Sequence, residues 1–275
     1  MQTMQENWQG AATLVDPAVP KRWGFWYVAE ARLRNMFKWW TAIVAFGIGN
    51  PVLYLFSVGV GIGSLISGPV DGVSYLTFLA PALLASAAIQ AAMDEVSFPT
   101  IEGFVWDKTF FAINSTGITG AQIVNGMMAV AMMRAVATVL IYEVILLMFG
   151  AITFDAVLPL LLSSSFAALA FAAVMFAVTV KIKDDDGFFA IIGRFVIAPM
   201  FMFSGTFYPL ENTPIYLQWI GWISPLWHAT DIGRALSYGA QVDGLLMIGH
   251  FGFLIAMAIG GFAWVYPQFV KRLSA

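Results

Sequence analysis

Residues 124–149 read VNGMMAVAMMRAVATVLIYEVILLMF, an apolar run in which Arg134 and Glu143 are the only charged side chains. An α-helix rises about 1.5 Å per residue, so a run of this length crosses the roughly 30 Å hydrocarbon core of a bilayer. Further runs that are long enough to cross lie at about residues 41–66, 74–93, 156–180, 188–208 and 245–266. The sequence therefore predicts an all-α integral membrane protein, with residues 1–275 forming a single domain of six transmembrane helices.

The amino-acid composition agrees with a membrane protein and argues against several other classes. Of the 275 residues, 60% are hydrophobic and 11% are charged, and the mean hydropathy is +0.81. Soluble domains carry about 25% charged residues. The chain has no cysteine, which excludes disulfides and thiolate metal sites, and its formal net charge of −3 argues against a nucleic-acid-binding surface.

Lysine and arginine residues outside the apolar runs indicate the orientation in the membrane. If all six runs cross, most of these residues fall on one side: Lys21, Arg22, Arg32, Arg34, Lys38, Lys108, Lys181, Lys183, Lys271 and Arg272. Arg134 and Arg194 lie inside runs, and Arg234 stands alone on the other side. Because basic residues accumulate on the cytoplasmic side, both termini are predicted to be cytoplasmic, with residues 1–22 as a cytoplasmic tail.

Residues 23–40 precede the first run and carry too many charges to cross the membrane. Their apolar side chains fall on one stripe of a helical wheel: Trp26, Ala29, Leu33, Phe37 and Trp40. Arg32 and Lys38 face away from this stripe. The pattern predicts an amphipathic helix in the cytoplasmic interface, either as an anchor for the first span or as a contact for a partner.

Residues 94–123 form the longest predicted cytoplasmic loop and mix charged with apolar residues. The apolar residues recur with a partly helical period, which predicts a short amphipathic helix. Large apolar side chains on a cytoplasmic surface need a partner, so we predict a docking surface here. Its contact residues are predicted to be Phe98, Ile101, Val105, Trp106 and Phe110. The alternative is that this helix packs against its own bundle.

Three consecutive aspartates, Asp184, Asp185 and Asp186, lie in the short cytoplasmic turn between the fourth and fifth runs. They could form a divalent-cation site. In so short a turn, a solvated acidic run or a contact with a basic partner surface is favoured.

The segment after the fifth run is apolar but rich in proline. It reads FSGTFYPLENTP from Phe203 and WIGWISPLWH from Trp219. Proline breaks a continuous helix, while the apolar residues keep the segment near the membrane. We therefore predict short re-entrant or interfacial helices within residues 209–244, on the outer side. Such backbone is tolerated at membrane depth only where protein or a water-filled cavity receives its polar groups.

Motifs for catalysis are mostly absent from the sequence. There is no Gly-Lys dipeptide and hence no phosphate-binding loop of the G-x-x-x-x-G-K-[ST] type, and neither H-E-x-x-H nor G-x-S-x-G occurs. Ser204, His228 and Asp231 could form an intramembrane hydrolytic site. A histidine at the membrane boundary is more often a hydrogen-bonded polar anchor, so this enzyme hypothesis is the weaker alternative.

Arg134 and Glu143 are ionisable residues inside a predicted span, where charge is costly and a functional role is the default hypothesis. Their spacing along one helix puts them on opposite sides, so they are not expected to pair with each other. Arg134 can extend toward the cytoplasmic interface, and Glu143 can meet a second copy or line a path. The chain lacks repeated membrane carboxylates, which disfavours a third hypothesis, an ion-coupled secondary transporter.

The order of these elements resembles the membrane subunit of type-2 ABC exporters. The sequence resemblance is sharpest over residues 204–210, SGTFYPL, and continues through Pro214, Pro225, His228, Asp231 and Arg234. Within that family the chain looks most like the branch of nodulation-factor (lipo-oligosaccharide) exporters and drug-efflux permeases. The architecture covers nearly the whole chain.

The resemblance implies partners and a location. Two copies of this subunit would pair with two copies of a cytoplasmic ABC ATPase in a bacterial plasma membrane. The ATPase would bind ATP and Mg²⁺, so this chain would hold no cofactor and catalyse no reaction itself. Residues 94–123 would contain the coupling helix, and Asp184–Asp186 would make a second contact with the ATPase.

The resemblance also implies a route for an exported lipid-linked glycan, lipid or amphipathic small molecule. Aromatic residues of the first, second and fifth spans would line it: Phe46, Tyr54, Phe78, Phe201, Phe203 and Phe207. The outer gate would be formed by Ser204, Gly205, Pro209, Pro225, His228 and Asp231. Each of these aromatic residues could instead face lipid or the protein core.

Overall fold

The computed structural model describes residues 18–38, 40–66, 68–183 and 187–274. Apart from an isolated bridge between Val70 and Val73, the regular structure in these ranges is helical. The elements are α1 (Ala18–Phe37), α2 (Trp40–Tyr54), η1 (Leu55–Ile62), η2 (Gly63–Leu65), α3 (Tyr75–Ile101), η3 (Glu102–Trp106), α4 (Thr109–Ser115), α5 (Gly120–Met148), α6 (Phe154–Thr179), α7 (Phe188–Ile192), η4 (Gly193–Ile197), α8 (Ala198–Phe203), η5 (Leu210–Asn212), α9 (Ile215–Trp222), α10 (Pro225–Tyr238) and α11 (Gly244–Leu273).

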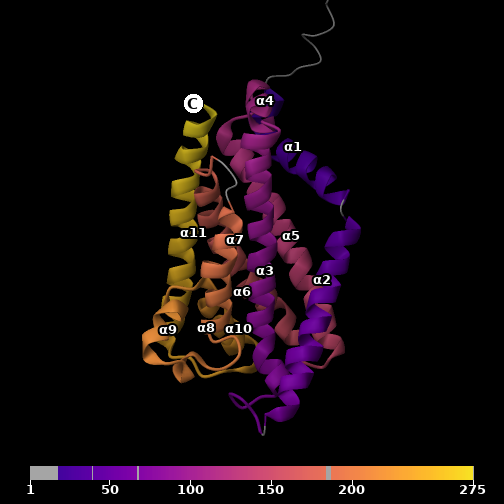
Figure 1. Ribbon diagram of the computed structural model, residues 1–275, viewed down its shortest axis with the longest axis vertical. Helices are drawn as coiled ribbons and strands as arrows, with labels where there is room; N and C mark the ends of the chain where they lie inside the picture. Colours follow the sequence, from indigo (N-terminus) through magenta and orange to yellow (C-terminus); the bar gives the residue numbers. More distant parts are fainter. Residues whose placement is uncertain (1–17, 39, 67, 184–186, 275) are drawn as a thin grey trace, which may run out of the picture.

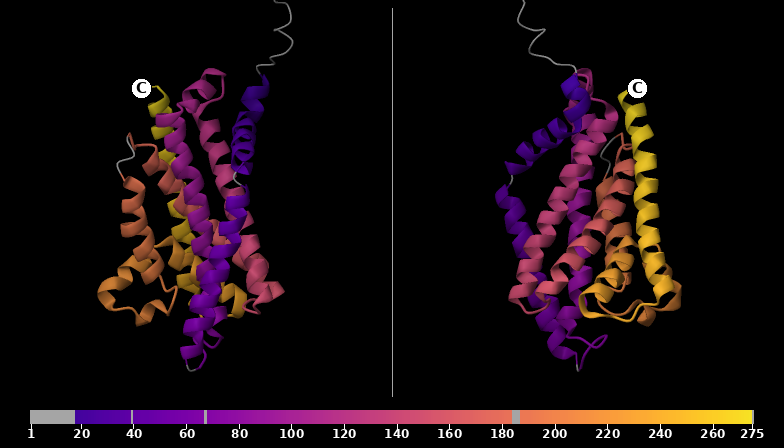
Figure 2. Two further views of the ribbon diagram at one scale, coloured as in Figure 1. Left: turned by 45° about the vertical axis from the view of Figure 1, so that its right-hand side comes forward. Right: turned by 180° about the vertical axis from the view of Figure 1, so that it is seen from behind.

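Four helices of the described chain are long and apolar enough to cross a membrane. They are α3 with its extension η3, α5, α6 and α11. They run along the long axis of the molecule (Figures 1 and 2), and α6 packs against α3, α5, α10 and α11. The predictions at 74–93, 124–149, 156–180 and 245–266 each fall on one of these helices, which confirms an all-helical membrane protein.

The first and fifth predicted spans are helical but composed of shorter pieces. Residues 40–65 pass from α2 into the π-helical η1 and the short η2, and residues 188–203 comprise α7, η4 and α8. The apolar helices found here, Val52–Leu65 and Phe188–Phe203, are shorter than the four long ones. A total of six spans therefore stays a prediction.

Large apolar side chains on the outer faces of the helices are exposed. Examples are Leu53 on α2, Val144 on α5, Leu158 on α6 and Ile248 on α11. In water such a surface would favour aggregation, whereas in a bilayer it contacts acyl chains at little cost. The exposed faces therefore fit a lipid environment.

The helix that contains the second predicted span is longer than that span. The sequence places the end near Met93, at the charged residues Asp94 and Glu95, but α3 continues to Ile101 and η3 to Trp106. Arg134 pairs with Asp94 and with Glu95, so these carboxylates are neutralised within the bundle and do not end the helix. The predicted loop at 94–123 consists largely of the end of α3, η3 and α4.

The predicted interfacial helix at 23–40 corresponds to α1, which runs obliquely beside the bundle in Figure 1. Its apolar stripe is divided: Ala29 is buried, whereas Trp26 and Phe37 are exposed. A Cβ atom at Gly126 of α5 would lie 2.6 Å from the carbonyl oxygen of Phe25, so glycine is what allows this close contact between α1 and α5.

Gly261 permits a similar close contact between α11 and α6, and this contact is open to test. A Cβ atom there would lie 2.6 Å from the Cβ of Ala173 and 2.8 Å from the Val174 nitrogen. Gly261→Leu is expected to destabilise the bundle by about 1–3 kcal/mol, because packing between membrane helices depends on small residues. Melting of the purified protein in detergent measures this. Gly260→Leu is the matched control, since a Cβ atom at Gly260 meets open space. Equal melting temperatures for the two variants would contradict the prediction.

The two ends of the molecule carry different elements. The start of α1, helix α4 and the end of α11 lie at one end, and α9 lies toward the other (Figures 1 and 2). The predicted docking surface and the predicted outer segment are therefore on opposite ends of the bundle.

Candidate functional site

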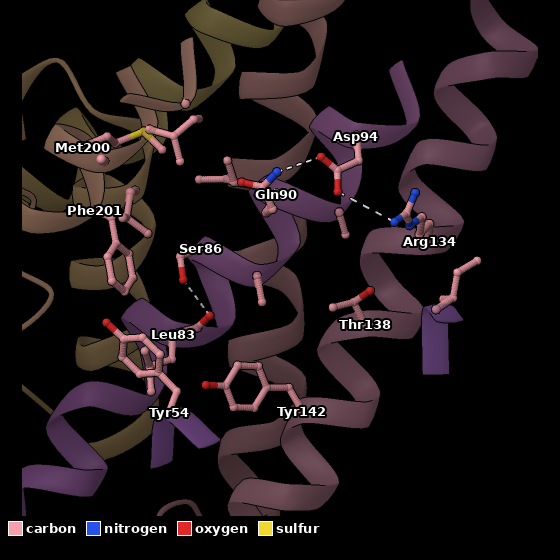
Figure 3. Close-up of a pocket in the computed structure, with 18 residues that line it drawn as sticks. Tyr54, Leu83, Ser86, Gln90, Asp94, Arg134, Thr138, Tyr142, Met200 and Phe201 are labelled. Carbon is pink, nitrogen blue, oxygen red and sulfur yellow. Dashed lines mark hydrogen bonds and ion pairs between the residues drawn. The ribbon is translucent and has the colours of Figure 1, made fainter. Parts of the chain in front are cut away.

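A cavity of about 530 Å³ opens between α2, α3, α5 and the η4–α8 segment. Figure 3 shows the side chains around it. Helix α3 contributes more of them than any other element. The lining residues are Ile43, Tyr54, Leu83, Ser86, Ala87, Ile89, Gln90, Ala91, Asp94, Arg134, Thr138, Tyr142, Gly193, Ile197, Ala198, Met200, Phe201 and Leu226.

The cavity has an aromatic part and a polar part. The rings of Tyr54 and Tyr142 lie in the lower part of Figure 3, and Tyr54 packs edge-on against Phe201 with 5.8 Å between ring centroids. Asp94 and Arg134 lie in the upper right of the view. An amphipathic molecule has the matching division, because an aromatic wall receives its apolar part and hydrogen-bonding groups receive its head.

The polar part is held together by contacts among its own side chains. The Gln90 amide donates to Asp94 Oδ1 over 2.7 Å, and Arg134 Nη2 lies 3.8 Å from Asp94 Oδ2. This second separation is long for an ion pair. The cavity therefore presents a carboxylate, a guanidinium and an amide that can exchange partners with a bound head group.

The aromatic residues predicted for the translocation route lie in different environments, and only some of them line the cavity. Tyr54 and Phe201 line the cavity, and Phe207 packs edge-on against Phe201. Phe203 is half-buried at the end of α8 and does not line it. The side chain of Phe46 lies outside the described residues.

Phe78 was predicted to line the route, but its side chain is fully buried in the core. Its ring is stacked with that of Tyr75, and the Arg234 guanidinium carbon lies 3.7 Å from the centroid of the Phe78 ring. The aromatic type alone does not distinguish a lining residue from a core residue, because both face apolar surroundings.

The intramembrane charges behave differently from each other. Arg134 Nη1 lies 3.0 Å from Glu95 Oε2, so its partner comes from α3. Glu143 is buried, and neither of its oxygens has a hydrogen-bond partner among the described residues. As predicted, the two residues do not pair with each other.

The predicted docking surface at the α4 end is partly exposed. Phe98 is 48% exposed and Trp106 54% exposed, and Val105 is half-buried. Phe98 also packs against Phe189 of α7, with ring centroids 4.5 Å apart. Phe98 and Trp106 are therefore accessible to a partner, and their docking role stays a prediction. Asp184, Asp185 and Asp186 lie outside the described residues.

Two predicted docking residues are instead inside the bundle. Ile101 is 0% exposed and Phe110 is 4% exposed. Phe110 packs against Phe104 and Phe269 at centroid distances of 5.0 and 5.2 Å. The prediction of exposed contacts is wrong for both. Phe110 is covered because α4 packs against the end of α11, and Ile101 is buried at the end of α3.

The predicted outer segment contributes to a buried polar cluster, which His250 of α11 completes. His228 Nδ1 lies 2.8 Å from His250 Nδ1, and His228 Nε2 lies 3.0 Å from the carbonyl oxygen of Trp222. Asp231 Oδ2 is 3.8 Å from His250 Nε2. Burial lowers the pKa of His228, and burial raises the pKa of Asp231 to about 6 against the opposing effect of Arg234.

The other predicted gate residues determine the backbone conformation of this segment. Gly205 has a φ of +74°, and its carbonyl accepts a hydrogen bond from Arg234. Pro225 starts α10 behind the cap residue Ser224, and Pro209 precedes η5. The chain breaks at these prolines as predicted, and α9 and α10 are short helices. Their re-entrant or interfacial position on the outer side stays a prediction.

Several important side chains were missed by sequence reasoning. Gln90 and Asp94 line the cavity, Glu95 is an ion-pair partner of Arg134, and His250 is the partner of His228. Asp94 and Glu95 were assigned to a loop because they follow an apolar run. Arg134 was a signal that could have located them, because a cation inside a span requires an anion at the same depth.

The family model described as ABC-2 type transporter matches residues 24–238, which extend from α1 to the end of α10. The chain belongs to the ABC-2 type transporter family. It is thus a transmembrane permease subunit of an ABC transporter, and membership implies partnership with an ABC ATPase subunit.

Curated relatives of this permease subunit carry the name Nodulation protein J. The protein from Rhizobium leguminosarum bv. viciae is 33% identical over 224 residues, covering 80% of this chain and 85% of the relative. The one from Rhizobium meliloti (strain 1021) is 31% identical over 230 residues, covering 82% and 86%. The one from Neorhizobium galegae is 29% identical over 224 residues, covering 80% and 84%. No solved structure matches the permease subunit significantly.

The geometry gives the enzyme hypothesis no support. Ser204 Oγ has no hydrogen-bond partner among the described residues, and the two ring nitrogens of His228 face His250 and the Trp222 carbonyl. A hydrolytic serine needs a base within hydrogen-bond reach, which this arrangement does not supply. Family membership points to a transport subunit.

Proposed function

We propose that this permease subunit forms half of the membrane route of an ATP-driven exporter. Its substrate would be a lipid-linked glycan, a lipid or an amphipathic small molecule, moved outward from the cytoplasm or inner leaflet. The observation that carries this proposal is the cavity in which Tyr54, Tyr142 and Phe201 face Gln90, Asp94 and Arg134. An aromatic wall next to charged and amide groups suits a molecule with one apolar and one polar part.

The energy source in this proposal is a separate subunit. The sequence has no phosphate-binding loop, so ATP and Mg²⁺ would be bound by the cytoplasmic ATPase partner. Two copies of the permease and two of the ATPase would form the complex in a bacterial inner membrane. Both termini would be cytoplasmic, and this is supported by the distribution of lysine and arginine.

The transport cycle would convert closure of the ATPase dimer into a change of access. ATP favours the closed dimer, so it shifts the equilibrium between inward- and outward-facing bundles by its differential affinity for the two states. Movement of the ATPase would be transmitted to the bundle through the docking surface around Phe98 and Trp106. Asp184–Asp186 would make a second contact with the ATPase. The outer helices α9 and α10 would close the exit between cycles.

Substitution at the docking surface provides a direct prediction. Trp106→Asp and Phe98→Asp should each weaken binding of the ATPase subunit by more than about tenfold, since exposed aromatic anchors carry much of an interface's energy. Co-purification from membranes and titration of the ATPase onto the detergent-solubilised permease measure this. The bundle should stay folded, because both side chains are about half exposed.

Tyr216→Asp is the matched control, because Tyr216 is an exposed aromatic residue on α9 near the opposite end. It should leave ATPase binding unchanged. Undiminished binding of the ATPase by both Trp106→Asp and Phe98→Asp would contradict the placement of the docking surface.

The proposed function itself is tested by reconstitution. Permease and ATPase are incorporated into vesicles and supplied with ATP and a panel of fluorescent lipids, glycolipids and amphipathic dyes. We expect ATP-dependent movement of at least one class, and none without the ATPase. Equal transport by the permease alone, with no ATPase present, would overturn the proposal.

A further inference from the structure

Four ion pairs join α1, α3, η3 and α5 beside the cavity. Arg32 of α1 contacts Glu95 of α3 over 2.5 Å and Glu102 of η3 over 3.2 Å. Arg134 of α5 contacts the second oxygen of Glu95 over 3.0 Å and Asp94 over 3.8 Å. Glu95 is therefore the central residue, with one arginine on each of its oxygens.

Glu95 is 1% exposed, and this burial sets the strength of the cluster. A buried carboxylate is stable only when opposite charges and hydrogen bonds replace its hydration. Two guanidinium groups from two different helices fulfil that requirement here. Each guanidinium also holds a further carboxylate, so a shift of any one member changes the environment of the next.

The cluster connects the cavity with the docking surface. At one end, Asp94 and Arg134 line the cavity. At the other end, Glu102 begins η3, whose last residue is the exposed Trp106. From η3, which ends at Trp106, ion pairs lead to the cavity through Glu102, Arg32, Glu95 and Arg134.

We propose that Glu95 is a positioning residue that couples the docking surface to the cavity. The proposal rests on the proposed export function and adds the device by which nucleotide state at the ATPase changes the cavity. Movement of η3 shifts Glu102 and hence Arg32, and Glu95 transmits the shift to Arg134. Arg134 then changes its contact with Asp94, which has the longest separation of the four pairs.

A purely structural role would give a different result. If the ion pairs only fasten α1 to the bundle, their loss lowers stability without affecting how the cavity responds to nucleotide. If Glu95 transmits the movement, its neutralisation removes that response in a complex that still assembles. A measurement inside the cavity separates the two, as a claim of coupling requires.

The absence of cysteine from the chain means that alkylation of the permease subunit reports on one introduced thiol. Ser86 lines the cavity, so Ser86→Cys introduces a single thiol there. The full permease–ATPase complex is reconstituted in nanodiscs, and the rate of thiol alkylation by N-ethylmaleimide is measured without nucleotide and with ATP plus vanadate. In the reference protein, Ser86→Cys alone, the two rates should differ severalfold.

Adding Glu95→Gln should abolish this difference while ATPase binding and basal ATP hydrolysis persist. Glu102→Gln should reduce the difference by more than half. It serves as the test if Glu95→Gln fails to fold, because the partly exposed Glu102 side chain tolerates the change. The matched control is Glu30→Gln, which breaks the exposed Arg34–Glu30 pair within α1 and should leave the difference intact.

Each outcome is decisive. Equal rates in the reference protein, with the ATPase bound, would overturn the proposed function. A severalfold difference in the reference protein that persists in Glu95→Gln, or in Glu102→Gln where the first variant does not fold, would overturn the coupling role alone. Loss of the difference in Glu30→Gln as well would also overturn it, because the effect would then not be specific to the cluster.

Discussion

Replacing Arg234 with glutamine is expected to unfold the outer segment and lower the melting temperature of the protein by about 10 °C. Arg234 is 4% exposed and donates to the carbonyl oxygens of Gly205 over 2.7 Å and Phe78 over 3.4 Å. It also lies 3.5 Å from Asp231 and above the ring of Phe78. One side chain thus fastens α10 to α3 and to the turn after α8.

The expected size follows from what glutamine leaves behind. Breaking a buried ion pair costs about 3–5 kcal/mol, because the remaining charge is uncompensated. For a chain of this size, 1 kcal/mol shifts the melting temperature by about 2–4 °C. Arg234→Lys should recover only part of the loss, since an ammonium cannot match the planar contacts of a guanidinium.

Thermal unfolding in detergent, followed by tryptophan fluorescence, measures this change. Arg194→Gln is the matched control, because Arg194 in η4 is exposed and should shift the midpoint little. If the Arg234→Gln protein has the same melting temperature as the parent protein, the outer segment is held by contacts other than those of this arginine.

The helices were predictable because hydrophobicity acts locally along the chain. The long apolar runs became α3, α5, α6 and α11, and the prolines at 209, 214 and 225 correctly predicted the breaks around η5, α9 and α10. In each case the signal lies in neighbouring residues. A sequence read alone is sufficient for features of this kind.

Partner choice was not predictable because it depends on residues far apart in the chain. Asp94 and Glu95 read as the start of a loop, yet Arg32 and Arg134 make them part of a helix within the bundle. His228 was seen as a boundary residue, and its partner His250 lies on α11. Only the packing of α1, α3, α5, α10 and α11 brings these groups together.

At the docking surface, the burial of apolar side chains also depends on residues far away in the chain. Phe98 and Phe110 have the same chemistry and similar spacing from charged residues, but one is half-exposed and the other is buried. What separates them is the presence of Phe269 from α11, opposite Phe110. Helical period gives the face of a helix but not what lies across from that face.

Phe269→Ala is expected to destabilise the α4 end of the bundle by about 3–5 kcal/mol, the usual cost of removing a buried phenylalanine ring. Its side chain is fully buried, and its ring lies 4.7 Å from Phe104, 5.2 Å from Phe110 and 5.9 Å from Phe176. Because this cluster holds η3 and α4 against α11, the same change should also weaken ATPase binding.

The two effects of Phe269→Ala are measured separately, by unfolding of the permease alone and by titration of the ATPase onto it at a temperature where the variant is folded. Phe111→Ala is the matched control: Phe111 belongs to the same helix as Phe110 but is partly exposed, so it should cost little stability. A Phe269→Ala protein that loses stability yet binds the ATPase with parental affinity would show that the orientation of η3 and α4 does not depend on the aromatic cluster. Because Phe98 and Trp106 flank the cluster without belonging to it, that result would leave their own role as docking residues to be decided by their aspartate variants.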